Sequence, residues 1–145
     1  MRFRLAEEHD IPGMTEVRLA VVENRLSDPG WLTRQMWMDA LAGSGNACSW
    51  VCELDGRILG FSTGRVRHAD IWALFVDPRF EGQGIGSRLL ELAVEWMNDQ
   101  GVAIIELSTA DRSRADVFYQ RKGWRRGERN AKGEVVFQWQ CNHPG

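Results

Sequence analysis

The sequence contains no long apolar run. Its longest, Ile71–Val76, has six residues, whereas a membrane-spanning helix needs about 18 or more consecutive apolar residues. The segment Met1–Glu8 also lacks the apolar stretch of a secretory signal peptide. We therefore expect a cytoplasmic protein with no membrane partner.

The chain also has no excess of positive charge. Its 18 Lys and Arg residues are balanced by 20 Asp and Glu residues, and binding to nucleic acid depends on a strongly basic face. We therefore expect no nucleic-acid partner. No internal repeat, long linker or low-complexity tract divides the 145 residues, of which 43% are hydrophobic. This length and composition predict one globular domain over residues 1–145.

Cysteine is scarce. The three residues Cys48, Cys52 and Cys141 are an odd number, which argues against a disulfide framework. A zinc site formed by these cysteines and His143 is the alternative. However, Cys48 and Cys52 lie in a strand-like segment, where four residues span about 13 Å, too far for two sulfurs that each sit about 2.3 Å from one metal. We therefore predict small buried thiols and no metal site.

What the chain does contain is a succession of predicted strands and helices. Alternating or β-branched segments predict strands at 2–6, 47–54, 57–64, 69–77, 102–108, 124–128 and 134–140. Apolar periodicity predicts helices at about 10–21, 85–98 and 113–123, and a further helical stretch that follows the break at 27–30 and stops at Gly43. The order predicts an α/β (α+β) fold with one mixed sheet of about seven strands and about four helices on its faces.

Local signals mark where several of these elements begin. Asp10 is expected to cap the first helix, which would extend to Val21 on its apolar face. The pair Asp55-Gly56 predicts a tight hairpin turn. Ser113 and Asp116 have the spacing of a capping box at the start of the last helix.

A glycine-rich segment, Gly82-Gln83-Gly84-Ile85-Gly86, separates a predicted strand from an amphipathic helix. Glycines let backbone N–H groups approach a ligand, and a helix N-terminus carries partial positive charge, so this arrangement favours phosphate binding. No Lys followed by Ser or Thr completes a P-loop. A dinucleotide fingerprint would need a glycine where Ser87 stands. A coenzyme A pyrophosphate site is the third interpretation.

Two motifs extend this signal. The segment Leu74-Phe75-Val76-Asp77-Pro78 precedes the glycines, and Ala115-x-x-Phe118-Tyr119-x-x-x-Gly123-Trp124 follows in the last predicted helix. Together they resemble the acetyl-CoA motif and the Ala-x-x-Leu-Tyr-x-x-x-Gly-Phe motif of the GNAT superfamily of N-acetyltransferases. The resemblance covers nearly the whole chain and implies the fold of that family, a mostly antiparallel, twisted sheet. It also implies acetyl-CoA as cosubstrate.

The resemblance implies which residues contact this cosubstrate. Backbone groups of Leu74, Phe75 and Val76 would bind the pantetheine arm and thioester. A second set would surround the pyrophosphate: Glu81, Gly82, Gln83, Gly84, Ile85, Gly86 and Ser87. Glu81 stands where the family usually has Arg or Gln, and we expect Arg79 or Arg88 to offset its charge. Arg112, a further candidate contact, stands where the family often has Asn.

Acetyl transfer to an amine needs a base, an oxyanion partner and a proton for the departing thiolate. A backbone N–H at the end of strand 69–77, where the resemblance implies a bulge, could bind the oxyanion. Tyr119, the only tyrosine, is the candidate proton donor and also a cofactor contact. The alternative is a core tyrosine with a satisfied hydroxyl.

The base is less clearly marked. Glu23, beside Asn24, is the first candidate and Asp70 the second. The imidazole of His68 and the carboxylate of Glu106 are further groups near the cofactor strand, and for each of these residues a solvated surface charge is the alternative. Trp31, Trp37 and Trp50 are candidates for an aromatic, mildly acidic acceptor pocket, and packing in the core, which explains most tryptophans, is the alternative. Such a pocket would favour a cationic small-molecule amine.

The sequence therefore predicts an N-acetyltransferase that transfers the acetyl group to a primary amine by direct attack in a ternary complex. A small-molecule acceptor is favoured, and a peptide N-terminus or protein lysine stays open, as does a homodimer. The main alternative is a non-catalytic acyl-CoA-binding or interaction module on the same fold. A nicotinamide-dependent oxidoreductase is a third alternative, for which the chain is short.

Overall fold

The computed structural model describes residues 1–21 and 33–141. Seven strands form one sheet in the order β1-β2-β3-β4-β5-β7-β6. They are β1 (Arg2–Leu5), β2 (Ala47–Leu54), β3 (Arg57–Arg65), β4 (Asp70–Val76), β5 (Ile104–Thr109), β6 (Arg125–Arg129) and β7 (Val135–Gln140). Neighbouring strands are antiparallel except for β4 and β5, which are parallel.

Four α-helices lie in the described part of the chain, together with two short 3-10 turns. The helices are α1 (Ile11–Ala20), α2 (Arg34–Asp39), α3 (Ile85–Asp99) and α4 (Arg114–Arg121), and the turns are η1 (Glu8–Asp10) and η3 (Pro78–Phe80). The predicted class, a mixed and mostly antiparallel sheet of seven strands with four helices, is confirmed. None of the described helices is long and apolar enough to span a membrane.

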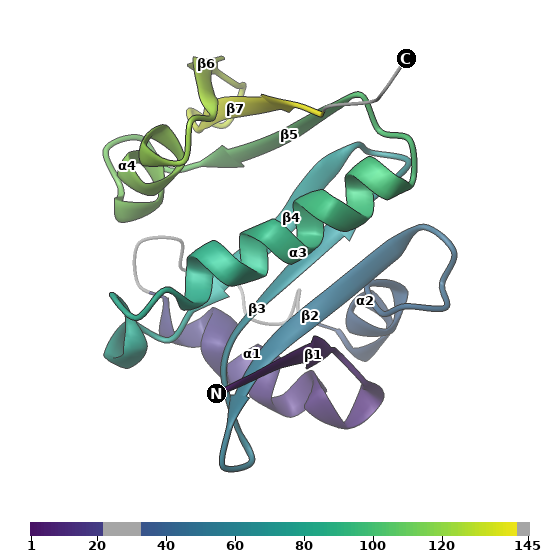
Figure 1. Ribbon diagram of the computed structural model, residues 1–145. Coiled ribbons are helices and arrows are strands. Elements are labelled where there is room, and N and C mark those ends of the chain that lie inside the picture. The colour runs from purple at the N-terminus through teal and green to yellow at the C-terminus, as the bar shows by residue number, and fades with distance from the viewer. Residues whose placement is uncertain (22–32, 142–145) are drawn as a thin grey trace.

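Helices cover both faces of the sheet (Figure 1). The alternation of side chains along β2 shows why. Trp50 and Cys52 join the apolar cluster that includes α3, whereas Val51 joins the cluster that includes α1. The turn that leads from β2 to β3 is the predicted hairpin, in which Asp55 and Gly56 have φ angles of 50° and 81°. Positive φ at both central residues is the geometry of a type I′ turn.

The N-terminal part of α1 differs from the prediction. The carboxylate of Asp10 accepts no bond from the first turn of α1. It accepts instead from the backbone N–H of Glu7, at 2.8 Å, and from the guanidinium of Arg4, at 2.7 and 2.9 Å. Asp10 is the last residue of η1 and has helical backbone angles, whereas a capping residue is usually extended. Its side chain is therefore directed toward Glu7 and Arg4, which precede it in the sequence. Val21 is also outside α1, because its ψ of 106° is extended.

The start of α4 carries the predicted Ser113 cap. The Oγ of Ser113 accepts from the backbone N–H of Asp116 at 3.2 Å. In a capping box the Asp116 carboxylate would accept from the backbone N–H of Ser113. Here this buried carboxylate accepts instead from the backbone N–H of Arg112, at 2.9 Å, and from Arg126 Nε, at 3.0 Å. The Arg126 guanidinium is the largest cause that lowers the pKa of Asp116 to about 2. These bonds hold the helix that carries Tyr119.

Asp116→Asn should therefore lower the free energy of unfolding at pH 7 by about 1–2 kcal/mol, a modest value because Arg126 is 40% exposed. The folded state lowers the pKa of Asp116, so its contribution is complete above about pH 4 and is lost as the pH falls towards 2. Thermal unfolding of both proteins from pH 7 to pH 2 should show the difference in Tm shrinking within this window. A difference that is constant with pH would contradict the assignment.

The three cysteines are core thiols, as predicted. Cys48, Cys52 and Cys141 are free, buried and part of the apolar cluster that packs against α3. Burial raises the pKa of Cys48 to about 11. His143, the fourth residue of the alternative zinc site, lies outside the described residues, among which no group of three metal-ligating side chains occurs.

Candidate active site

The parallel strands β4 and β5 separate from each other along their length (Figure 1). Their register has one residue pair, Asp70 with Glu106, beside a bond from the backbone N–H of Glu106 to the carbonyl of Ala69 at 2.8 Å. Beyond this point, β3 is the one ladder partner of β4 among the described strands. The last residues of β4, Leu74–Val76, therefore form an open strand edge that faces α4 rather than β5.

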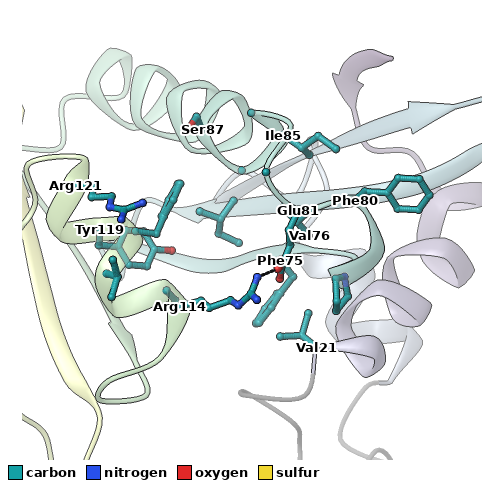
Figure 2. A pocket seen from close by; sticks show the side chains of 18 residues that line it. Val21, Phe75, Val76, Phe80, Glu81, Ile85, Ser87, Arg114, Tyr119 and Arg121 are labelled. Atoms are coloured by element: carbon teal, nitrogen blue, oxygen red, sulfur yellow. Dashed lines mark hydrogen bonds and ion pairs between the residues drawn. The ribbon is translucent and has the colours of Figure 1, made fainter.

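A pocket of about 870 Å³ lies at this open edge, and we call it the glycine-loop pocket. It is bounded by the end of β4, by the loop after η3, by the first turn of α3 and by one face of α4 (Figure 2). The predicted contacts that line it are Leu74, Phe75, Val76, Glu81, Gly82, Gly84, Ile85, Gly86, Ser87 and Tyr119. The structure thus brings together two motifs that are far apart in the sequence.

The glycines of this loop leave room at the start of α3. Gly82 and Gly84 have φ angles of 78° and 82°, and a Cβ on either would meet no described atom within 4 Å. Gly84 is also the N-cap residue of α3 and provides no side-chain cap. Because the first N–H groups of a helix have no partner inside the helix, they remain available to a phosphate. The local geometry fits the phosphate-binding interpretation.

Glu81 lines the pocket, but its partner differs from the prediction. Its carboxylate pairs with Arg114 of α4. Arg79 pairs with Asp77 instead, at 2.9 Å, and Arg88 pairs with Glu91, at 3.2 Å. Helix α4 approaches the loop from across the pocket, so the offsetting charge comes from 33 residues further along the chain.

Two cations of α4 were missed by the sequence reasoning. Arg114 and Arg121 both line the glycine-loop pocket. They lie four residues before and three residues after Phe118, which the second motif had already identified. Residues at these spacings share one helix face, so the motif together with helical periodicity could have indicated both as partners of a phosphate.

Glu81→Gln should strengthen the binding of coenzyme A about two- to fivefold, because it removes a negative charge from the pocket that would surround a pyrophosphate. The residue is about one-third exposed, so the effect is modest. Isothermal titration at low salt would measure it, with Glu91→Gln, an exposed carboxylate outside the pocket, as the matched control. Equal affinity in wild type and Glu81→Gln would place the carboxylate away from the ligand.

Two other predicted contacts do not line the pocket. Gln83 is exposed between the two glycines, and Arg112 is exposed at the start of α4. Arg112 has a φ of 61°, and its backbone N–H donates to Asp116. Its role in this structure is that of a turn residue, and contact between either side chain and a cofactor stays a prediction.

A second pocket of about 1050 Å³ lies beside the first. We call it the acceptor pocket, for the role proposed for it. It is lined by residues of α1, α2, β4 and β5. The two pockets share four lining residues: Leu74, Phe75, Ala115 and Tyr119. Ligands in the two pockets would therefore meet at the end of β4, opposite Tyr119.

Tyr119 is held by aromatic packing. Its side chain is 5% exposed, and its ring centroid lies 5.3–5.7 Å from those of Phe118, Phe137 and Trp124. The hydroxyl points into the glycine-loop pocket (Figure 2) and makes no hydrogen bond to any described residue. Burial raises the pKa of Tyr119 above its usual value, so the phenol stays protonated at neutral pH. The hydroxyl is therefore a protonated group at the pocket, and the raised pKa makes it a weaker acid than a free phenol; its role as a proton donor stays a prediction.

The base candidates are dispersed. Glu23 lies outside the described residues, as do Asn24 and Trp31. Asp70 lines the acceptor pocket but is bonded to Arg65 at 2.6 and 2.9 Å. His68 lines the same pocket and is exposed.

Glu106 is not brought to either pocket. Its carboxylate accepts from Gln138 Nε2 at 2.8 Å.

The β-bulge of β4 lies at a different place from the one expected. Thr63 pairs with Ala73 and Gly64 with Ile71, so Trp72 is the extra residue of the bulge. The bulge is therefore near the middle of β4 and not at its end.

The predicted aromatic, mildly acidic lining of an acceptor pocket stays a prediction, and the structure places two of its three tryptophans in different surroundings. Trp37 lines the acceptor pocket, but Trp50 packs against Trp96 on the other face of the sheet, with ring centroids 5.9 Å apart. Trp72, which the prediction omitted, is the second tryptophan of this lining. The described lining is also not acidic, because it contains equal numbers of carboxylates and of Lys and Arg side chains.

Comparison with known proteins agrees with this geometry. Residues 14–124 match the model of the acetyltransferase (GNAT) family. An uncharacterized N-acetyltransferase of Methanocaldococcus jannaschii is 33% identical over 100 residues, which cover 62% of this chain and 42% of that protein. The chain thus spans less than half the length of this relative.

Two solved structures show the same fold. The PaiA N-acetyltransferase of Thermoplasma acidophilum, in complex with coenzyme A, has a TM-score of 0.81 at 14% identity, covering 97% of this chain and 99% of that one. The yncA protein of Salmonella typhimurium, solved with its cofactor acetyl-CoA, has a TM-score of 0.72 at 18% identity, covering 100% and 96%. The open strand edge and glycine loop therefore belong to a GNAT fold. The family match covers most of the chain, which belongs to the GNAT family of acetyltransferases.

Proposed function

We propose that this protein transfers the acetyl group of acetyl-CoA to the primary amine of a small molecule by direct attack. The observation that carries the proposal is the position of the Tyr119 hydroxyl, which is unbonded among the described residues and lies where two pockets meet. One pocket has the features of a phosphate site, and the other lies where an acceptor can reach the end of β4.

The residues present fit acetyl-CoA. The open cradle at Gly82 and Gly84 and the start of α3 would hold the pyrophosphate, with Arg114 and Arg121 supplying positive charge. The unpaired edge of Leu74–Val76 would bind the amide groups of the pantetheine arm as an added strand does. When bound, acetyl-CoA supplies an activated acetyl group as a thioester.

The chain's own groups then act on the reacting atoms. The acceptor nitrogen bonds to the thioester carbon, the carbon–sulfur bond breaks, and Tyr119 donates its proton to the departing sulfur. A backbone N–H of the open β4 edge stabilises the developing oxyanion. The amine's proton passes to a base, for which Glu23 remains the first candidate. Direct attack is supported because Cys48, Cys52 and Cys141 all lie in the core and line neither pocket.

The test is release of free coenzyme A from acetyl-CoA across a panel of amines. A primary amine has a pKa near 10.4, so only about 0.1% is neutral near pH 7.4, and the assay should run from pH 7 to pH 9. We expect saturable, amine-dependent thiol release together with an acetylated product identified by mass spectrometry. Binding of acetyl-CoA without amine-dependent release from any panel member would instead support a non-catalytic acyl-CoA-binding module.

A further inference from the structure

Arg18 is the cation of the acceptor pocket with a buried nitrogen that lacks a hydrogen bond among the described residues. It lies in the last turn of α1, and the buried nitrogen is Nη1. No hydrogen bond or ion pair joins its guanidinium to another described side chain. Arg65, in the same lining, differs because Asp70 already accepts two of its N–H groups.

An arginine in this state destabilises the fold. Burial lowers the pKa of Arg18, but a guanidinium does not lose its proton at neutral pH, so the charge remains and is poorly solvated. The guanidinium makes a cation–π contact with Phe75, whose ring centroid lies 4.5 Å from the guanidinium carbon. That cation–π contact offsets part of the cost, but a ring face cannot satisfy the N–H groups in the guanidinium plane.

The location of Arg18 relates it to the reacting centre. Phe75 is one of the four residues that line both pockets. The guanidinium lies over this ring and therefore near residues that both pockets share. Because Arg18 lines the acceptor pocket alone, a group bound by it would belong to the acceptor.

The carboxylates of the lining differ in their partners. Asp70 forms an ion pair with Arg65, whereas Asp39 and Glu134 accept from the neutral donors Gln35 and Ser108, at 2.8 and 3.2 Å, and keep their charge. Among the described residues, no carboxylate of the lining forms an ion pair with Arg18. An anionic group on the acceptor would therefore supply the partner that the buried Nη1 atom of Arg18 lacks.

We propose that the acceptor is a small amino acid or similar amino-carboxylate, and that Arg18 binds its carboxylate, an inference that rests on the proposed acetyl transfer. The planar guanidinium presents two parallel N–H groups that match the two oxygens of a carboxylate. Bound in this way, the acceptor would present its amine to the end of β4. Arg18 would then determine specificity without touching the reacting atoms.

The test compares amino acids with their amides, which keep the amine and remove the negative charge. Glycine, alanine and β-alanine are each paired with the corresponding amide, and kcat/KM for thiol release is measured for wild type and Arg18→Gln. The ratio of acid to amide should fall about tenfold to a hundredfold in Arg18→Gln, because bonds between charged groups in a buried site contribute strongly. Comparing ratios cancels the different pKa values of the two amines. Arg125→Gln removes an exposed cation outside both pockets and should change the ratio less than about twofold.

Two further measurements separate the possible outcomes. Calorimetry measures the affinity of the same acids and amides for the protein saturated with coenzyme A, and therefore tests the role of Arg18 without turnover. If no amine gave thiol release, acetyl transfer alone would be overturned. Equal treatment of acids and amides, or an unchanged ratio in Arg18→Gln, would overturn the carboxylate site while acetyl transfer stands. Arg18→Met should unfold at a temperature no lower than wild type, because it removes a half-buried charge whose Nη1 atom has no hydrogen bond among the described residues. A Tm lower by several degrees would make Arg18 a structural residue and would also overturn the proposal.

Discussion

Gly84→Glu should abolish the binding of acetyl-CoA while the protein stays folded. Gly84 is the N-cap of α3, has a φ of 82°, and has open space where a Cβ would lie. A glutamate there would place a side chain and a negative charge where the backbone must approach phosphate, and would compete for the N–H groups of the first turn. Binding should then weaken beyond detection rather than by a small factor.

Ligand-induced stabilisation measures this effect. At a cofactor concentration a hundredfold above Kd, binding should stabilise the wild-type protein by about 2.7 kcal/mol and raise its Tm. Gly84→Glu should show no such rise. A folded Gly84→Glu protein that keeps the full rise would mean that the pyrophosphate binds elsewhere.

The matched control is Gly56→Glu. Gly56 has a φ of 81° and open space around its Cβ position, as Gly84 does, but it lies in the β2–β3 turn and lines neither pocket. Both variants pay a similar backbone strain, about 1–3 kcal/mol for a side chain at positive φ. Gly56→Glu should therefore lower the Tm without changing the shift produced by acetyl-CoA, which separates strain from loss of the site.

Much of the fold could be predicted because its signals are local. The Asp55-Gly56 turn requires positive φ angles that these two residues tolerate, and the glycine loop follows directly from a strand that ends at Val76. The residues next to each turn in the sequence are enough to predict it. In the same way Ser113 caps a helix that begins at the next residue.

The remaining features depend on contacts between distant segments. The sheet order places β5 between β4 and β7, and the separation of β4 from β5 creates both pockets. No local pattern encodes that separation. The pairing of Glu81 with Arg114 has the same cause, since α4 reaches the loop only because the sheet positions it there.

Side-chain direction limited the prediction of the acceptor pocket. Trp37 and Trp50 are equally apolar in the sequence, yet they pack on opposite faces of the sheet. Arg18 has the spacing of an ordinary surface residue of α1, and only the tertiary structure shows that its Nη1 atom is buried without a partner. A charge that is unremarkable in the sequence can therefore become the main specificity candidate of a site.

Tyr119→Phe should lower kcat about a hundredfold or more near pH 7, the usual range for loss of a general acid. The substitution removes one oxygen and leaves the ring among Phe118, Phe137 and Trp124. The hydroxyl makes no hydrogen bond to a described residue, so the free energy of unfolding should change little, and the affinity for acetyl-CoA should be retained. A tyrosine with only a structural role would show the reverse, a loss of about 1 kcal/mol in stability with turnover nearly intact.

The pH dependence provides a second readout for the same variant. Burial raises the pKa of Tyr119, so the wild-type phenol remains protonated across the range from pH 6 to 9 and its titration should not limit kcat there. The thiol of coenzyme A should have a pKa near the 8.5 of a cysteine, and the departing thiolate therefore needs a proton less as the pH rises. The rate deficit of Tyr119→Phe should accordingly shrink between pH 7 and pH 9, measured by single-turnover acetylation so that product release does not mask the chemical step. An unchanged single-turnover rate at pH 7 would remove Tyr119 from the mechanism, whereas a deficit that is constant with pH would assign it to orienting the thioester rather than to proton donation.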